Sequence, residues 1–521
     1  MGVSRECSCK GCFAKRRAMQ GNDFGSARNG AEGATETLQR CHFDSVQHRS
    51  AWLNRLRNQK NGISMIDPKT LAARLPGDFT FGVATAAFQI EGASKTDGRK
   101  PSIWDAFCNM PGRVYNRDNG DVACDHYNRL DQDLDLIKSI GVEAYRFSIA
   151  WPRIIPDGSG PVNEAGLDFY DRLVDGCKAR GIKTFATLYH WDLPLLLAGD
   201  GGWTARSTAY AYQRYAKTVM ARLGDRLDSV ATFNEPWCIV WLSHLYGIHA
   251  PGERNMQAAL HAMHHMNLAH GLGVEAIRAV APNVPVGLVL NASSVIPGSE
   301  SAADKAAGER AHQFHNGAFF DPVFKGGYPK EFLEALGDRM PVVEDADLRI
   351  INQKLDWWGL NYYTPLRVAD DPAKNGDFPW TIEAPRVSDV KTDIGWEVYA
   401  PGLKNVVEDL YRRYELPECY ITENGACYNM DVVNGEVDDQ PRLDYYSDHL
   451  DVVADLIKDG YPMRGYFAWS LMDNFEWAEG YRMRFGLVHV DYHTQVRTVK
   501  KSGEWYSELA AQFPKGNHKV S

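Results

Sequence analysis

The chain has 521 residues, of which 44% are hydrophobic and 24% charged, as in ordinary globular proteins. Its formal net charge of −10 argues against a nucleic-acid partner, because phosphates call for a basic surface. No apolar run reaches the roughly 18 residues of a membrane span, and the N-terminus lacks the apolar stretch of a secretory signal. We therefore expect a protein that has neither a membrane nor a nucleic-acid partner.

The cysteines point to a reducing compartment. The sequence contains 10 Cys, and six of them are scattered through the main body of the chain. Several lie in apolar runs that are typical of strands, as Cys419 does. We expect buried free thiols and a cytoplasmic location. The six are Cys108, Cys124, Cys177, Cys238, Cys419 and Cys427.

Residues 1–64 differ from the rest of the chain. They hold 11 Lys and Arg against 5 Asp and Glu, and they show no clear periodicity. The Cys7, Cys9 and Cys12 cluster matches no zinc template, since no second Cys/His pair follows at a suitable distance. We interpret residues 1–64 as an extension that is disordered or not native, with Met65 as a natural start. Residues 65–521 would then form one catalytic domain.

From Phe79 onward, short β-branched and aromatic runs alternate with longer amphipathic segments. The eight strand-like runs are 79–84, 143–149, 183–189, 229–233, 285–291, 355–361, 417–423 and 463–469. The helix-like segments include 127–140, 163–180, 206–223, 256–280, 402–414 and 444–459. Eight such units in a chain of this length predict an α/β fold, a single (β/α)8 TIM barrel.

Active sites of such barrels lie on the loops at the C-terminal ends of the strands. Polar and aromatic residues do gather just after the predicted runs. They are Gln89, His190, Trp191, Asp192, Asn234, Glu235, Asn361, Tyr362, Tyr363, Glu423, Asn424 and Trp469. A doubly wound sheet would instead require a glycine-rich turn after the first strand, which residues 82–87 do not supply.

Glu235 and Glu423 follow the fourth and seventh runs, which we expect to face one another across the barrel. Cleavage of a glycosidic bond needs one carboxyl group to protonate the leaving oxygen and another to stabilise or trap the developing cation. Two carboxyls placed in this way can approach to about 5–5.5 Å, as in retaining glycosidases. One Glu at a strand end is more often a surface or capping carboxylate. Two glutamates at strand ends, each next to an Asn in the sequence, favour a catalytic role.

Five motifs occur in the order of a known family. Two surround the glutamates, T-F-N-E-P at 232–236 and Y-I-T-E-N-G at 420–425. The others are F-T-F-G-V-A-T-A-A-F-Q-I-E-G at 79–92, L-Y-H-W-D-L-P at 188–194 and W-S-L-M-D-N-F-E-W at 469–477. Together they resemble glycoside hydrolase family 1, and within it most of all the cytoplasmic bacterial β-glucosidases of the agrobacterial type. The resemblance covers residues 75–513 and leaves 1–64 without a counterpart.

The resemblance implies a role for each matching residue. Glu423 would be the nucleophile and Glu235 the acid/base of a retaining β-glucosidase that acts by double displacement. Asn234 resembles the amide that binds the sugar 2-hydroxyl, and Tyr363 the tyrosine that hydrogen-bonds the nucleophile. Arg146 resembles an arginine near the nucleophile, although a purely structural ion pair is an equal alternative. The charge of Glu423 would raise the pKa of Glu235.

The resemblance also implies the residues of the sugar pocket. The expected glycone contacts are Gln89, His190, Trp191, Glu476 and Trp477, with Trp469 as the floor beneath the ring, Asn361 as a supporting amide, Phe485 near carbon 6 and Trp396 on the aglycone side. For each aromatic residue alone, core packing is the competing interpretation. The histidines at 261, 264, 265 and 270 form no metal motif, and carboxyl chemistry requires neither a metal nor another cofactor.

Several alternatives stay open or are disfavoured. Galactosides or fucosides could be main or side substrates, since one Gln/Glu pair often serves both glucose and galactose. A 6-phospho-β-glycosidase is disfavoured because the carboxylate of Glu476 would repel a phosphate. A thioglucosidase would have Gln in place of Glu235, and a non-catalytic sugar-binding module would be free to lose one glutamate. The expected partner is a small β-glycoside or short oligosaccharide, and a homodimer is an expectation from the resemblance.

Overall fold

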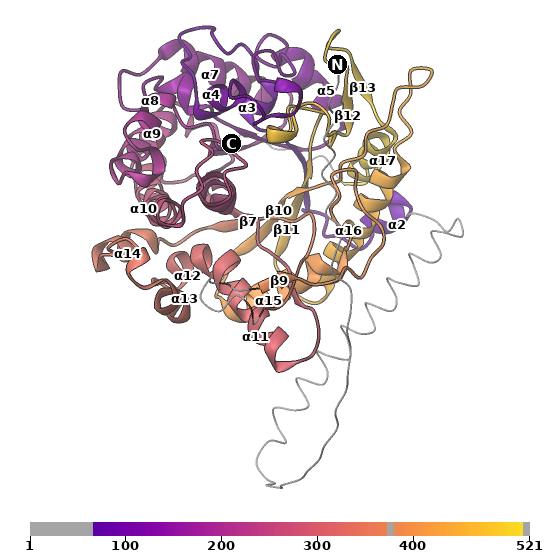
Figure 1. Cartoon of the computed structure of the whole chain (residues 1–521). Helices are drawn as coiled ribbons and strands as arrows, with labels where there is room; N and C mark the ends of the chain where they lie inside the picture. Colours follow the sequence, from indigo (N-terminus) through magenta and orange to yellow (C-terminus); the bar gives the residue numbers. More distant parts are fainter. Residues whose placement is uncertain (1–65, 372, 374–378, 380, 514–521) are drawn as a thin grey trace, which may run out of the picture. The chain divides into compact units, whose positions relative to one another are not determined.

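The computed structural model describes residues 66–371, 373, 379 and 381–513. The predicted extension at 1–64, with its three clustered cysteines, lies outside these residues. Eight parallel strands close into a barrel in the order β1-β11-β10-β7-β5-β4-β3-β2. In Figure 1 these strands occupy the centre and the helices surround them. The predicted (β/α)8 architecture is therefore confirmed.

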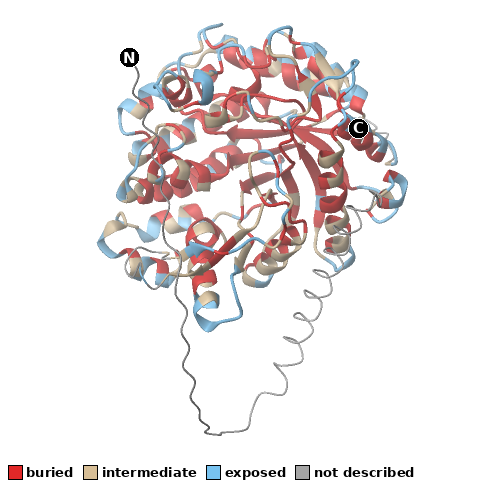
Figure 2. Ribbon diagram, turned by 45° about the vertical axis from the view of Figure 1, so that its right-hand side comes forward, coloured by how far each residue is buried: buried red, intermediate tan, exposed pale blue. Residues whose placement is uncertain are grey.

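All eight predicted runs form barrel strands. Their bounds are β1 (Thr80–Ala84), β2 (Ala144–Ser148), β3 (Lys183–Tyr189), β4 (Ser229–Asn234), β5 (Val286–Leu290), β7 (Trp357–Asn361), β10 (Glu418–Asn424) and β11 (Met463–Trp469). Most of their residues are buried, because helices cover the outer surface and side chains fill the interior. Figure 2 shows this buried centre and a shell whose exposed residues face outward.

The predicted amphipathic segments also form helices. They are α5 (Leu130–Ile140), α7 (Glu164–Ala179), α9 (Ser207–Leu223), α10 (Met256–Val280), α15 (Pro401–Arg413) and α16 (Gln440–Lys458). In α5 the buried Leu134 and Ile137 lie at helical spacing. The helix ends at Gly141, whose φ of 85° is a left-handed conformation that glycine adopts without a steric penalty.

The sequence did not predict the insertions between barrel strands. Between β5 and β7 lie β6 (Val295–Pro297), α11 (Ala302–His312), α12 (Ala318–Phe324), α13 (Lys330–Leu336) and α14 (Asp345–Ile351). After β7 come β8 (Leu366–Asp370) and β9 (Thr381–Glu383), which form a small sheet with β6. After β11 come the hairpin β12 (Val488–Val490) and β13 (Arg497–Val499), then α17 (Lys501–Ala510). Short helices lie between these elements: α2 (Pro68–Ala72), α3 (Ala87–Ile90), α4 (Ile103–Cys108), α6 (Trp151–Ile154), α8 (Leu195–Gly199), η1 (Tyr115–Arg117), η2 (Gly202–Thr204), η3 (Cys238–Leu245), η4 (Gln313–Gly317), η5 (Gly337–Arg339) and η7 (Trp477–Glu479).

One detail of the predicted geometry is wrong. The strands that carry the two glutamates, β4 and β10, are separated by β5 and β7. In a ring of eight, the strand directly opposite β4 is β11 rather than β10. The two glutamates therefore reach the barrel mouth from strands that are three places apart, which still allows their side chains to meet over the barrel axis.

Two further expectations can be compared with the structure. The six cysteines of the main body are free and buried, as predicted. Within residues 66–371, 373, 379 and 381–513, no helix combines the length and the apolar character needed to cross a membrane.

Candidate active site

A cavity of about 1020 Å³ opens at the C-terminal ends of the barrel strands. Eleven of the predicted site residues line it. They are His190, Trp191, Glu235, Asn361, Tyr363, Trp396, Glu423, Trp469, Glu476, Trp477 and Phe485. The other three, Gln89, Asn234 and Arg146, are buried and hydrogen-bonded to residues of the lining. The structure thus brings together all the side chains that the sequence placed in one site.

Glu423 has partners that favour its charged form. Arg146 Nη1 lies 2.7 Å from Glu423 Oε1, and the Tyr363 hydroxyl donates to Glu423 Oε2 at 2.8 Å. Burial raises the pKa of Glu423 above its usual value, and the charge of Arg146 and the donors around the carboxyl group offset part of that rise. The guanidinium contact is a buried ion pair, with side chains only 2% and 4% exposed.

Glu235 has a different environment. Its Oε1 accepts a hydrogen bond from Asn361 Nδ2 at 2.7 Å, and its Oε2 lies 3.0 Å from Cys238 Sγ. Neither donor is charged. Burial and the neighbouring charge of Glu423 raise the pKa of Glu235 to about 8. Because Glu423 has a cation at contact distance, it loses its proton first, and Glu235 keeps its own at neutral pH.

A hydrogen-bond network through Arg146, Asn234 and Asn361 connects the two glutamates. Arg146 Nη2 donates to Asn234 Oδ1 at 2.6 Å, and Asn361 Nδ2 lies 3.0 Å from the same oxygen. Asn234 Nδ2 lies 3.1 Å from His190 Nε2, and Trp191 Nε1 donates to the Asn234 carbonyl at 3.0 Å. Residues from β2, β3, β4 and β7 are therefore fixed relative to one another. Trp191 therefore also helps to hold the Asn234 backbone in place.

Two polar atoms at this site, one on Gln89 and one on His190, are available to a small molecule. Gln89 Nε2 donates to Asn474 Oδ1 at 2.9 Å and to the Phe475 carbonyl at 2.8 Å, and it lies 3.4 Å from Glu476 Oε2. Among the described residues, neither Gln89 Oε1 nor His190 Nδ1 has a hydrogen-bond partner, although both atoms are buried. Such orphaned atoms are costly unless a ligand or water satisfies them. They suit the hydroxyl groups of a sugar.

Aromatic rings complete the pocket. His190 is stacked against Trp469 and Trp477, with ring centroids 5.9 and 6.0 Å apart. On another side, Tyr363, Trp396 and Phe485 contact one another at 5.4–6.1 Å. Flat apolar faces next to unsatisfied polar atoms form the combination that carbohydrate binding requires.

Glu476 is another carboxyl group in the lining of this pocket. Burial, followed by the charges of Glu423 and Glu235, raises its pKa to about 8. Glu476 therefore keeps its proton to a higher pH than an ordinary carboxyl group does. The repulsion of a phosphate that the sequence suggested is accordingly weaker than a formal carboxylate charge would give.

Three site residues have left-handed backbone conformations that are uncommon outside glycine. The φ angles are 48° at Glu235, 80° at Trp191 and 48° at Trp477. Such conformations cost free energy and persist where the surroundings impose them, often at functional sites. Here they turn the chain sharply after β4, after β3 and in the loop that follows β11.

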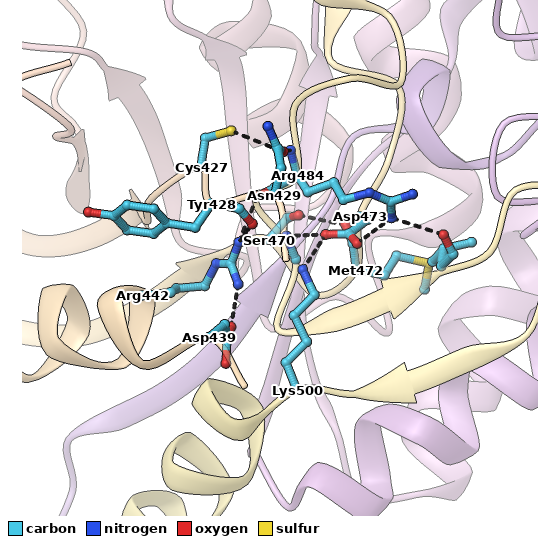
Figure 3. Close-up of polar contacts among 12 residues, drawn as sticks. Cys427, Tyr428, Asn429, Asp439, Arg442, Ser470, Met472, Asp473, Arg484 and Lys500 are labelled. Carbon is cyan, nitrogen blue, oxygen red and sulfur yellow. Dashed lines mark hydrogen bonds and ion pairs between the residues drawn. The ribbon is translucent and has the colours of Figure 1, made fainter. Parts of the chain in front are cut away.

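A network of ion pairs and hydrogen bonds connects the loops that follow β10 and β11 (Figure 3). Asp473 accepts hydrogen bonds from Lys500 Nζ at 2.6 Å and from Arg484 Nη1 at 2.7 Å. Although burial raises the pKa of Asp473, these two cations hold it below its usual value. Asp473 therefore ties the loop that carries Glu476 to the segments beside Phe485 and α17.

Arg442, on α16, extends this network to the loop of the Glu423 strand. It pairs with Asp439 and donates to the carbonyl groups of Tyr428 and Arg484, both at 2.7 Å, and of Ala426 at 3.0 Å. Asp439 in turn accepts hydrogen bonds from Ser502. The two loops, α16 and the start of α17 are thus connected through fully buried charges.

The sequence missed several residues of this site. Cys238, Trp237 and Asn291 line the cavity, and Trp237 Nε1 donates to His315 Nδ1 at 2.8 Å. The spacing of Cys238, three residues after Glu235 at the start of η3, is a signal that could have identified it. Arg442 lies outside every motif, and no sequence signal marked it.

The predicted histidine cluster on α10 has protein partners. His264 contacts the Tyr328 hydroxyl and Asp347, each at 3.0 Å, and His270 Nδ1 lies 2.7 Å from Thr232 Oγ1. In the part of the chain that the structure describes, no group of three or more His, Cys, Asp or Glu could hold a metal ion.

The chain is similar to known proteins over nearly all of its described length. The family model described as "Glycosyl hydrolase family 1" matches residues 71–514. A β-glucosidase from an Agrobacterium species is 80% identical over 457 residues, which make up 88% of this chain and 100% of that protein.

Solved structures agree with this match. Virulence factor SghA from Agrobacterium tumefaciens superposes with a TM-score of 0.85 at 81% identity, covering 86% of this chain and 100% of that one. The same factor has been solved with its substrate analogue salicin. A family 1 β-glucosidase from Thermotoga maritima has a TM-score of 0.81 at 44% identity, covering 84% of this chain and 98% of that chain.

Proposed function

Because the chain belongs to glycosyl hydrolase family 1, we propose that it is a retaining β-glucosidase whose nucleophile is Glu423 and whose acid/base is Glu235. One observation carries the assignment of roles. The buried carboxyl groups of Glu235 and Glu423 line the same cavity, and of these two only Glu423 is paired with a guanidinium. Their environments separate them into a charged and a protonated member, as a double displacement requires.

The first step is the attack of the Glu423 carboxylate on the anomeric carbon. Glu235 donates its proton to the glycosidic oxygen as the bond to the aglycone breaks. Glycosylation removes the charge of Glu423, so the pKa of Glu235 falls and its carboxylate becomes a base. A water molecule that gives its proton to Glu235 then attacks the same carbon and releases the sugar. Two inversions leave the anomeric configuration unchanged.

The proposed substrates carry a terminal non-reducing β-D-glucosyl residue, as in cellobiose, short β-glucosides and aryl β-glucosides. The similarity to the Agrobacterium β-glucosidase supports this glycone, and the salicin complex of the 80% identical virulence factor supports a small aryl glucoside. Galactosides and fucosides remain the alternative, since they differ from a glucoside by few hydroxyl contacts. In this proposal Gln89 and His190 bind glycone hydroxyls through their unpaired polar atoms.

Asn234, Asn361, Tyr363 and Arg146 would hold the reacting groups in place, and Trp396 would contact the aglycone. We further propose that residues 65–521 form one catalytic domain, that the enzyme acts in the cytoplasm on sugars derived from cellulose or other polysaccharides, and that it forms a homodimer. The 457 residues matched by the Agrobacterium relative account for all of that protein and support the domain boundary.

Hydrolysis of 4-nitrophenyl β-D-glucoside tests the proposal. The wild-type chain should release nitrophenol, and nuclear magnetic resonance should detect the β-anomer of glucose first. Glu423→Ala should abolish release, whereas Glu418→Ala, at the other end of the same strand, should not. Full activity in Glu423→Ala would contradict the role of the nucleophile, and first appearance of the α-anomer would contradict retention.

Glu235→Ala isolates the acid/base. It should impair substrates with poor leaving groups far more than activated ones, because a good leaving group departs without a proton. Equal losses on both classes of substrate would contradict the acid role.

A further inference from the structure

We propose that Cys238 is a positioning residue for Glu235, and that its thiol leaves Oε2 as the carboxyl oxygen that carries the catalytic proton. This inference rests on the proposed acid/base role of Glu235. The two residues are joined by a tight turn, since the Cys238 N–H donates to the Glu235 carbonyl at 3.0 Å. This turn brings the thiol back to the side chain of Glu235 at the edge of the cavity.

The two oxygens of Glu235 have unequal donors. Asn361 Nδ2 lies 2.7 Å from Oε1, whereas Cys238 Sγ lies 3.0 Å from Oε2. Asn291 Nδ2 lies 3.5 Å from the same sulfur and orients it from the other side. An amide N–H is a full hydrogen-bond donor, and a thiol S–H is a weak one.

This difference decides where the proton resides. A protonated carboxyl group has a carbonyl oxygen, which accepts hydrogen bonds well, and a hydroxyl oxygen, which accepts them poorly. Placing the proton on Oε1 would weaken the strong bond from Asn361, whereas placing it on Oε2 weakens only the contact with Cys238. The proton therefore occupies Oε2. After it is transferred, the carboxylate regains both donors.

The thiol of Cys238 suits this position because it is a hydrogen-bond donor, but a weak one. Cys238 is buried, and burial raises its pKa well above the usual value, so the sulfur keeps the proton that it donates. A serine hydroxyl would donate more strongly, stabilise the carboxylate and lower the pKa of Glu235. A side chain without a donor would raise that pKa.

Two matched pairs of variants test the proposal. Cys238→Ala and Cys238→Ser differ by one hydroxyl, as do the nearly isosteric Cys238→Val and Cys238→Thr. The readout is the pH dependence of kcat/KM on 4-nitrophenyl β-D-glucoside, whose descending limb reports the loss of the Glu235 proton. Ala and Val should move this limb to higher pH, and Ser and Thr to lower pH, each by about half a pH unit.

Cys177 provides the control because it is equally buried, on α7 and away from the cavity. Cys177→Ala and Cys177→Ser should leave both limbs of the pH profile unchanged. Thermal unfolding of every variant shows which of them are folded, and either pair alone suffices if the other pair fails to fold. A merely structural role would lower kcat without shifting the two members of a pair in opposite directions.

The outcomes separate this inference from the proposed function. If the descending limb stays in place, or if both members of a pair shift it in the same direction, while Glu235→Ala still shows the leaving-group dependence expected of a lost acid, the role of Cys238 is wrong. If Glu235→Ala shows no such dependence, the proposed function itself fails. In the Glu235→Ala background, exchanging Cys238 should no longer affect the pH profile.

Discussion

Arg146 touches Glu423 and Asn234 with separate nitrogens, at 2.7 Å and 2.6 Å. One guanidinium thus fixes the charge of the carboxylate on β10 and the orientation of the amide on β4. A lysine has a single point of charge and cannot reproduce this forked contact.

Arg146→Met should lower kcat by about 10²-fold or more, because Glu423 loses the cation that favours its charged form. Its pKa should rise, so the ascending limb of the pH profile should move to higher pH. Arg146→Lys should restore the charge but not the contact with Asn234, and recover only part of the rate. An unchanged ascending limb in Arg146→Met would contradict the electrostatic role. The measurement is kcat/KM against pH, with Arg172→Met on the barrel exterior as a control.

Wild-type activity should decline as the pH rises through about 8. Glu235 works as an acid only while it is protonated, and burial together with the charge of Glu423 raises its pKa to about 8. The pH profile of kcat/KM reports this free-enzyme value. Trapping the enzyme as a 2-fluoroglucosyl adduct removes the charge of Glu423, so the pKa of Glu235 in the adduct should be lower. A higher value in the adduct would contradict the coupling of the two carboxyls.

Glu476→Ala should reduce kcat/KM for β-glucosides by about 10²-fold, because the pocket then loses a group that can either accept or donate a hydrogen bond to a sugar hydroxyl. The loss should be smaller for β-fucosides than for β-galactosides, since these two sugars differ only at the 6-hydroxyl. Steady-state kinetics on matched 4-nitrophenyl glycosides measure the ratio. Equal losses on β-galactosides and β-fucosides would show that Glu476 does not bind the hydroxyl at carbon 6.

Lys500→Met should lower the free energy of unfolding by about 3 kcal/mol or more, because it removes one of the two cations that pair with the fully buried carboxylate of Asp473. The adjacent Lys501→Met is the matched control. Lys501 is 46% exposed and pairs with the exposed Asp438, so its loss should change the stability by less than about 1 kcal/mol. Calorimetric unfolding midpoints compare the two variants. Similar unfolding midpoints for the two variants would contradict a large contribution of the buried network to stability.

The sequence predicted the barrel well because its periodicity is local. The run at 183–189 and the segment at 256–280 coincide with β3 and α10. The glutamates and the aromatic residues were found because they lie directly at strand ends, where the fold itself forces convergence.

The parts that the sequence could not predict depend on contacts between distant segments. Nothing in the neighbourhood of Arg442 indicates that its guanidinium reaches three carbonyl groups on other loops. The raised pKa of Glu476 was also unpredictable, because it results from burial and from the charges of Glu423 and Glu235, and only the folded pocket brings these together. The helices α12, α13 and α14, inserted after β5, were missed since they span only seven residues each.

The C-terminal helix has a consequence for where the chain can be cut or joined. Lys500 and Ser502 anchor Asp473 and Asp439, and the Tyr506 hydroxyl donates to the carbonyl groups of Gly82 and Tyr466. The C-terminal helix α17 is therefore hydrogen-bonded to β1 and β11, the first and last strands of the barrel. A protease that removed α17 would inactivate an otherwise uncut pocket, whereas an affinity tag or a fused domain attached beyond Phe513 would leave these anchors in place.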